Sequence, residues 1–181
     1  MLSKNLTCHI STHNAAVRSM RVEVASRPQG ALYLSYELTG DLAQIHIPAP
    51  QPAIATDGLW QHTCFEAFIA VEGETRYHEF NFSPSGQWAA YAFRDYRERS
   101  AWTVSQTPVI SFTQNDGLLQ LEAVIAVADL PQNIACKPFQ LGLTAVIEAI
   151  DGSRSYWALH HPDAHPNFHH RAGFILSFNQ I

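Results

Sequence analysis

Side chains in the middle of the chain alternate between apolar and polar with a period of two, and this pattern constrains the fold more than any other feature. The alternation runs through residues 60–71, resumes at residues 77–83 and returns at residues 87–93. A period of two is that of a β-strand, whose successive side chains point to opposite faces of a sheet. The intervening segments, Glu72-Gly73-Glu74 and Ser83-Pro84-Ser85-Gly86, have the composition of turns. We therefore expect three neighbouring strands joined by two tight turns.

The two faces of this predicted sheet differ in their chemistry. One face is apolar and suits a core, with Phe65, Ala67, Ile69, Val71, Phe80 and Phe82. On the other face we expect Glu66, Glu79 and Asn81 to lie side by side, with Trp60 and Tyr77 beside them. Carboxylates accept hydrogen bonds from hydroxyl groups, amides both donate and accept, and aromatic rings stack on the apolar face of a sugar. This composition indicates a site for a polyol or a sugar.

The remainder of the chain also consists of short segments with strand periodicity, separated by turn sequences. Further strands are predicted at residues 17–25, 31–38, 44–47, 108–112, 118–127, 138–150, 155–160 and 173–178. Asn115-Asp116-Gly117 and Asp151-Gly152 are hairpin turn sequences. Short strands, frequent turns and no long helical periodicity predict an all-β, antiparallel β-sandwich. The 181 residues fit a single domain, residues 1–181.

Three runs of residues carry a resemblance to a known family. They are LWQHTCFEAF at residues 59–68, HEFNFSPSGQWAAYAFRDYR at residues 78–97 and YWALHHPDAHPNFHH at residues 156–170. In this order they resemble the signature runs of DOMON-like proteins, which are β-sandwiches related to family 9 carbohydrate-binding modules. The resemblance implies a jelly-roll-like sandwich that binds a ligand, a saccharide or in some members haem, without catalysing a reaction. It also implies that Arg97 anchors the end of a strand.

Pattern and resemblance together select candidate residues for binding a saccharide or a cell-wall sugar derivative. The candidates are Trp60, His62, Glu66, Tyr77, Glu79, Asn81, Trp88, Glu148, Trp157, His160 and His161. In this hypothesis Trp60 and Trp157 form walls of the site, and His160 and His161 close it from a loop. Two alternatives remain open for the carboxylates: an ordinary solvated sheet face, and a glycoside hydrolase that uses two of them.

The loop at residues 160–170 is rich in histidine and supplies a further alternative. Pro162 and Pro166 argue against a helix there. Imidazoles from His161, His165 and His169 could bind a divalent metal such as zinc or copper, or ligate haem. The chain has only two methionines, which disfavours haem with a methionine partner. A metal- or haem-binding redox module is thus the rival of a saccharide-binding module, for which no cofactor is expected.

Composition narrows the remaining classes of function. The net charge of −5 disfavours a nucleic-acid partner, and no apolar run reaches the roughly 18–20 residues of a membrane span. Three cysteines without CxxC spacing, and a start without a continuous apolar segment, indicate free thiols and a cytoplasmic location. No nucleophile, base and orienting group can be placed together from the sequence, so we expect no enzymatic activity.

Overall fold

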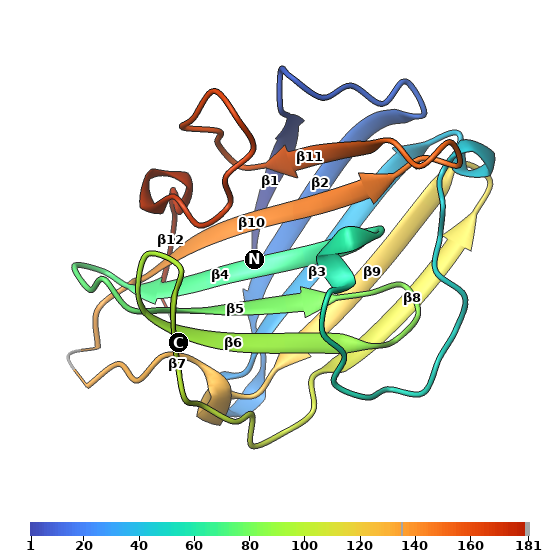
Figure 1. Cartoon of the computed structure of the whole chain (residues 1–181). Helices are drawn as coiled ribbons and strands as arrows, with labels where there is room; N and C mark the ends of the chain where they lie inside the picture. The colour runs from blue at the N-terminus through green and yellow to red at the C-terminus, as the bar shows by residue number, and fades with distance from the viewer. Residues whose placement is uncertain (135, 180–181) are drawn as a thin grey trace.

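Antiparallel strands form two layers that pack face to face (Figure 1). The computed structural model describes residues 1–134 and 136–179. The first sheet contains β4 (Cys64–Val71), β5 (Tyr77–Phe82), β6 (Trp88–Asp95), β7 (Glu98–Ser100), β10 (Phe139–Glu148), β11 (Arg154–Ala158) and β12 (Leu176–Phe178). The second contains β1 (Leu2–Cys8), β2 (Val17–Ser26), β3 (Leu32–Gly40), β8 (Val109–Asn115) and β9 (Leu118–Ile125). The other regular structure in the described residues is short 3-10 turns. The predicted antiparallel β-sandwich is confirmed.

Strand β1 connects the two sheets. The spatial order is β7-β6-β5-β4-β10-β11-β1-β2-β3-β9-β8, with β12 pairing with β10 beside β11. Residues Leu2 to Leu6 of β1 pair with β2, whereas Thr7 and Cys8 pair with β11. The strand therefore passes from one layer into the other, and its last residues, Thr7 and Cys8, lie beside β11. The sequence did not lead us to expect this strand, nor the short edge strand β7.

The core lies between the layers and contains the side chains that the alternation assigned to it. From the strands at the centre of each sheet it takes Leu32, Leu34, Tyr36, Leu38, Phe65, Ala67, Ile69, Val71, Phe80, Phe82, Leu119, Leu121, Ala123, Ile125, Leu141, Leu143, Ala145 and Ile147. One polar contact crosses this core. The Tyr36 hydroxyl of β3 donates a hydrogen bond to the Glu66 carbonyl oxygen of β4 at 2.7 Å. This bond joins the two sheets directly beneath the predicted polar face.

The outer face of the first sheet is partly covered by the C-terminal segment. A second apolar cluster contains Phe68, Ala70, Tyr77, Phe93 and Phe174, with Tyr91 and Phe168 packed against it. The loop after β11 folds back beside β10 (Figure 1), and its Phe168 and His169 contact Phe68 of β4 and Tyr77 of β5. Cys64, at the other end of β4, packs with Leu59 and Ala89, and all eight residues of β4 are buried, on both of its faces.

Two segments that were predicted as strand, residues 60–63 and residues 44–47, are not strand in the structure. Residues 60–63 do not extend β4, because Gly58 has φ +78° and starts a 3-10 turn, Leu59–Gln61. Residues 44–47 do not form a strand either. They follow the 3-10 turn Leu42–Gln44 and contribute one isolated bridge, between Ile45 and Ala149. Both segments become loops at the same end of β4 and β10.

No helical segment in residues 1–134 or 136–179 combines the length and the apolar character that a bilayer crossing requires.

Replacing Gly142 by alanine should destabilise the sandwich. An added Cβ would lie 2.7 Å from Phe174 Cδ1, so the ring that covers the outer face would have to move. Overpacking of this kind costs about 1–3 kcal/mol in the free energy of unfolding. Chemical denaturation of Gly142→Ala measures the loss. Gly173→Ala is the matched control, because its Cβ would meet His160 O at an ordinary 3.4 Å. Equal stability of the two variants would contradict the packing described.

Candidate functional site

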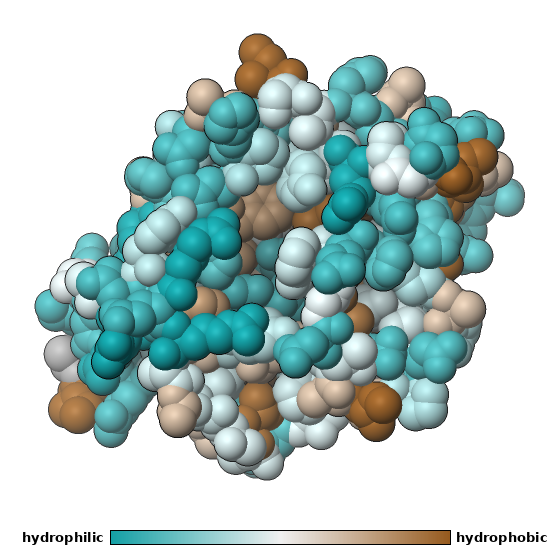
Figure 2. Space-filling view, viewed as in Figure 1, coloured by the Kyte–Doolittle hydropathy of each residue, from teal (hydrophilic) through white to brown (hydrophobic). Residues whose placement is uncertain are grey.

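A pocket of about 340 Å³ opens on the outer face of the first sheet, beside the C-terminal segment. Its lining comes from six strands (β4, β5, β6, β7, β10 and β11), from the two turns that carry Trp60 and Arg97, and from the loop after β11. The lining residues are Trp60, Glu66, Phe68, Glu79, Phe93, Arg97, Arg99, Val146, Tyr156, Pro166, Phe168 and His169. Figure 2, which views the same face, shows apolar surface inside a hollow that is surrounded by hydrophilic residues. The polar strip predicted from the sequence therefore lies in a concave site.

Two buried carboxyl groups form the floor of the pocket. Glu66 and Glu79 lie on the neighbouring strands β4 and β5, and their residues are only 3% and 5% exposed. Asn81 Nδ2 donates to Glu79 Oε1 at 2.8 Å, whereas Glu66 Oε1 is buried and has no hydrogen-bond partner among the described residues. A buried polar atom without a partner is costly and is uncommon in folded proteins. Glu66 Oε1 is thus available to a ligand.

Burial favours the protonated form of both carboxyl groups. It raises the pKa of Glu66 well above its usual range, and the nearby Glu79 carboxylate raises it further, while the neighbouring Thr144 hydroxyl lowers it in part. Burial also raises the pKa of Glu79, although the hydrogen bond from Asn81 and the charges of Arg99 and Arg97 counteract part of that effect. Glu66 therefore favours its neutral form, in which it both donates and accepts hydrogen bonds.

Basic and imidazole groups line the side of the pocket next to Glu79. Arg97 and Arg99 follow β6, and Arg97 has a left-handed backbone with φ +55°. Its amide donates to the Tyr77 hydroxyl oxygen at 3.1 Å, so the Tyr77 proton is free to point at His169 Nδ1, 2.8 Å away. The ring proton of His169 then lies on Nε2, which is 3.6 Å from Glu79 Oε2.

His169 is a neutral group in this site. Burial, together with the charges of Arg97 and Arg99, lowers the pKa of His169 to about 4. At neutral pH the contact between His169 and Glu79 is therefore dipolar and not an ion pair. The hydrogen bond between Tyr77 and His169 ties the loop after β11 to β5 beside the pocket.

Aromatic rings supply the remaining walls. Trp60, from the turn before β4, is 48% exposed and stands at the rim. Phe68, Phe93, Tyr156 and Phe168 lie deeper, and the guanidinium of Arg99 sits 3.9 Å from the ring centre of Tyr91 beside them. A concave site with apolar rings and a few convergent polar groups is the usual composition of a small-molecule site.

The structure brings together only some of the predicted residues. Trp60, Glu66 and Glu79 line the pocket. Tyr77 and Asn81 lie on the same face and bond to pocket residues, to His169 and Glu79 respectively. The other candidates, His62, Trp88, Glu148, Trp157, His160 and His161, are not among the lining residues.

The expected position of Trp157 is wrong. Trp157 pairs with Ala145 of β10, whose side chain points inward, and it lies in the core at 7% exposure. Tyr156, the preceding residue, points outward and lines the pocket in its place. Trp88 is likewise on the wrong face, because it pairs with Phe82, a core residue, and so points away from Asn81. Neither indole can wall a ligand in the pocket.

The loop histidines have separate partners. His161 Nε2 lies 2.9 Å from the Thr7 carbonyl oxygen, on β1, whereas His169 contacts Tyr77 and Glu79. A metal or haem at His161, His165 and His169 stays a prediction.

Several pocket residues were missed. Phe68 could have been found, since it shares a strand face with Glu66 by its spacing of two. Arg99 and Phe168 had no signal of this kind. Arg99 lies on the short edge strand β7, and Phe168 lies in the loop after β11. The paths of both segments depend on tertiary contacts.

No family model and no curated protein sequence matches the chain. Solved structures do match. A protein of Bacteroides uniformis that is thought to bind carbohydrate aligns with a TM-score of 0.74 and 16% identity, over 99% of this chain and 87% of that one. The chain has the β-sandwich fold of family 9 carbohydrate-binding modules. Such a module from Caldicellulosiruptor kristjanssonii aligns in its glucose complex with a TM-score of 0.58 and 11% identity, over 96% and 83% of the chains. Its cellotriose complex gives 0.55 and 12%, over 96% and 82%.

The buried carboxyl pair should make stability depend on pH. Because the folded state raises the pKa of Glu66, its contribution is fully present below roughly pH 4.3, the ordinary glutamate value, and is lost as the pH rises through the folded pKa. Glu66→Gln should therefore show a shallower fall in the free energy of unfolding above that pH. Urea unfolding at several pH values measures this, with Glu72→Gln on an exposed turn as the control. Parallel pH profiles for wild type and Glu66→Gln would contradict the inference.

Proposed function

We propose that this pocket binds a saccharide, or a sugar derivative of the cell-wall type, and that it does so without catalysis. The observation that carries the proposal is the Glu66 carboxyl group, which lines the pocket, is buried and has an oxygen without a partner among the described residues. A ligand hydroxyl would supply the missing hydrogen bond, and Glu79 beside it offers a second acceptor. The sandwich fold shared with family 9 carbohydrate-binding modules supports the same ligand class.

The arrangement of groups suits a sugar better than an apolar ligand. The carboxyl groups on the floor can bond to ligand hydroxyl groups, and the Arg97 and Arg99 guanidinium groups can donate from one side. Trp60 at the rim and Tyr156 deeper in the pocket offer ring faces. The two arginines also extend the preference to a sugar with an acidic substituent, such as a carboxylate or a phosphate. The volume of about 340 Å³ is at the small end of ligand pockets, which are roughly 300–1,000 Å³.

The placement of the carboxyl groups supports recognition without turnover. A glycosidase flanks the scissile bond with one protonated and one ionised carboxyl group, or with a nucleophile and an acid. Here Glu66 and Glu79 stand side by side on neighbouring strands at the floor, burial raises the pKa of each, and Asn81 holds Glu79. We propose in addition that the chain is a DOMON-like protein that works in the cytoplasm.

Glu79→Gln and Trp60→Ala should weaken saccharide binding while the fold is kept. Loss of a hydrogen bond to a charged group costs about 1.5–3 kcal/mol, which corresponds to at least roughly tenfold in affinity. A screen of mono- and oligosaccharides, neutral and acidic, identifies a ligand, and calorimetric titration then compares the variants. Glu72→Gln is the matched control and should bind as the wild type does.

Two results would count against the pocket as the binding site. One is unchanged affinity in Glu79→Gln together with a lower melting temperature, which would make the carboxylate structural. The other is turnover of aryl glycosides that Glu79→Gln abolishes, which would make the protein a hydrolase.

A further inference from the structure

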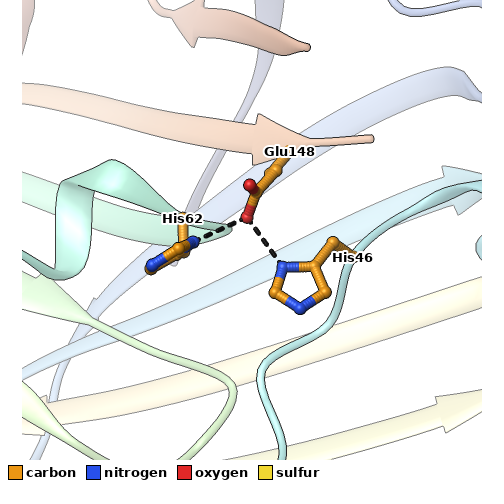
Figure 3. A group of neighbouring side chains, drawn as sticks. All are labelled: His46, His62 and Glu148. Atoms are coloured by element: carbon orange, nitrogen blue, oxygen red, sulfur yellow. Dashed lines mark hydrogen bonds and ion pairs between the residues drawn. The ribbon is translucent and has the colours of Figure 1, made fainter. Parts of the chain in front are cut away.

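A second convergent group of polar side chains lies at the end of β10, outside the lining of the pocket. His46 Nδ1 and His62 Nδ1 each lie 2.7 Å from the same oxygen, Glu148 Oε2 (Figure 3). The three atoms that could bind a metal ion, one from each side chain, lie within 4.8 Å of one another. Among the described residues, these three are the group of histidine, cysteine or acidic side chains whose geometry could hold a metal ion.

The backbone that carries these side chains is fixed by buried hydrogen bonds. The Thr63 hydroxyl, on a residue with no exposed surface, donates to the His46 carbonyl oxygen at 2.6 Å and accepts from the Glu148 amide at 3.1 Å. The His46 amide in turn donates to the Glu148 carbonyl oxygen at 2.8 Å. One buried hydroxyl thus holds the loop before residue 48, the start of β4 and the end of β10 in a single arrangement. Ligands held in this way need little reordering when they bind an ion.

The charges also suit a cation. The Glu148 carboxylate is the common partner of both imidazoles, each at 2.7 Å from its Oε2. The Glu148 side chain is only 15% exposed, whereas those of His46 and His62 are 52% and 55% exposed. An anionic oxygen therefore stands at the base of the group, and both imidazoles lie at the surface, where an ion can enter and water can complete its coordination.

We propose that His46, His62 and Glu148 form a site for a divalent transition metal ion, with Zn²⁺ as the best match. Imidazole nitrogen and carboxylate oxygen are zinc ligands, and a His₂Glu set with open positions is a known zinc arrangement. Ligand atoms at about 2.0–2.1 Å from a tetrahedral zinc lie roughly 3.3 Å apart. The nitrogen–oxygen distances of 2.7 Å need to open by about half an ångström, which rotation of the exposed rings permits. Each neutral imidazole would then carry its proton on Nε2 and present the Nδ1 lone pair to the ion.

The site would lie close to the pocket without sharing its residues. Val146 lines the pocket and Glu148 follows it two residues later on the same face of β10. Trp60 at the rim is likewise two residues before His62. An ion would tie these two segments to the loop that carries His46. The competing explanation is a hydrogen-bonded clamp of two histidines on one carboxylate, with no ion.

Zinc titration of the untagged, metal-stripped protein separates the two explanations. Calorimetry should find one equivalent of Zn²⁺, and Co²⁺ should give the visible absorption bands of a low-symmetry nitrogen–oxygen site. His62→Ala and Glu148→Gln should each lower zinc affinity at least tenfold. His62→Ala should keep the fold, checked by circular dichroism, because its side chain is half exposed. The rise in melting temperature on adding Zn²⁺ should disappear in the same variants.

His165→Ala is the matched control, since it removes an exposed histidine from the other histidine-rich segment. It should bind Zn²⁺ as the wild type does. The inference is overturned if the wild type binds no zinc in the presence of a weak competing chelator. It is also overturned if binding survives in His62→Ala and is lost in His165→Ala or His161→Ala, because the ion would then lie in the loop after β11.

Discussion

The structure depends on β4 being covered on both faces. A strand in a two-layer sandwich ordinarily packs one face on the core and leaves the other in water. In this chain the inner face of β4 packs against the second sheet, and its outer face lies beneath the segment that contains Phe168 and Phe174. At the Cys64 end of β4 the cover is a different one, the cluster of Leu59, Cys64 and Ala89. The pocket is the uncovered part, and its floor is buried because the sheet around it is covered.

Burial of the floor explains why its carboxyl groups are unusual. Taking an ionised carboxylate out of water is costly unless it is paired or hydrogen-bonded. Glu79 has Asn81 and the two arginines nearby, whereas the backbone of Glu66 is held by Tyr36 and its side chain has an oxygen left over. A fold gains no stability from that arrangement. Such unsatisfied groups are expected where a ligand completes the hydrogen bonds.

Two pairs of histidines have different surroundings. In the loop after β11, His161 Nε2 lies 2.9 Å from the Thr7 carbonyl oxygen of β1, and His169 contacts Tyr77 and Glu79 of β5. These contacts hold the loop against the first sheet and β1. His46 and His62 differ, because both direct Nδ1 to one carboxylate oxygen at an exposed end of the sheet. The two pairs of histidines therefore differ in the partners of their ring nitrogens and in the exposure of their side chains.

The sequence by itself determined which side chains share a face. Alternation is local, so the core set and the neighbouring positions of Glu66, Glu79 and Asn81 could be predicted from spacing alone. It failed at Tyr156 and Trp157, because two adjacent aromatic residues give no apolar–polar contrast from which to choose a face. Tertiary structure decided the rest. His46 meets Glu148 across 102 residues, β1 changes sheets, and a loop without periodicity closes the pocket. Contacts between distant segments follow from strand order and loop path, and a pattern confined to one segment carries no information about either.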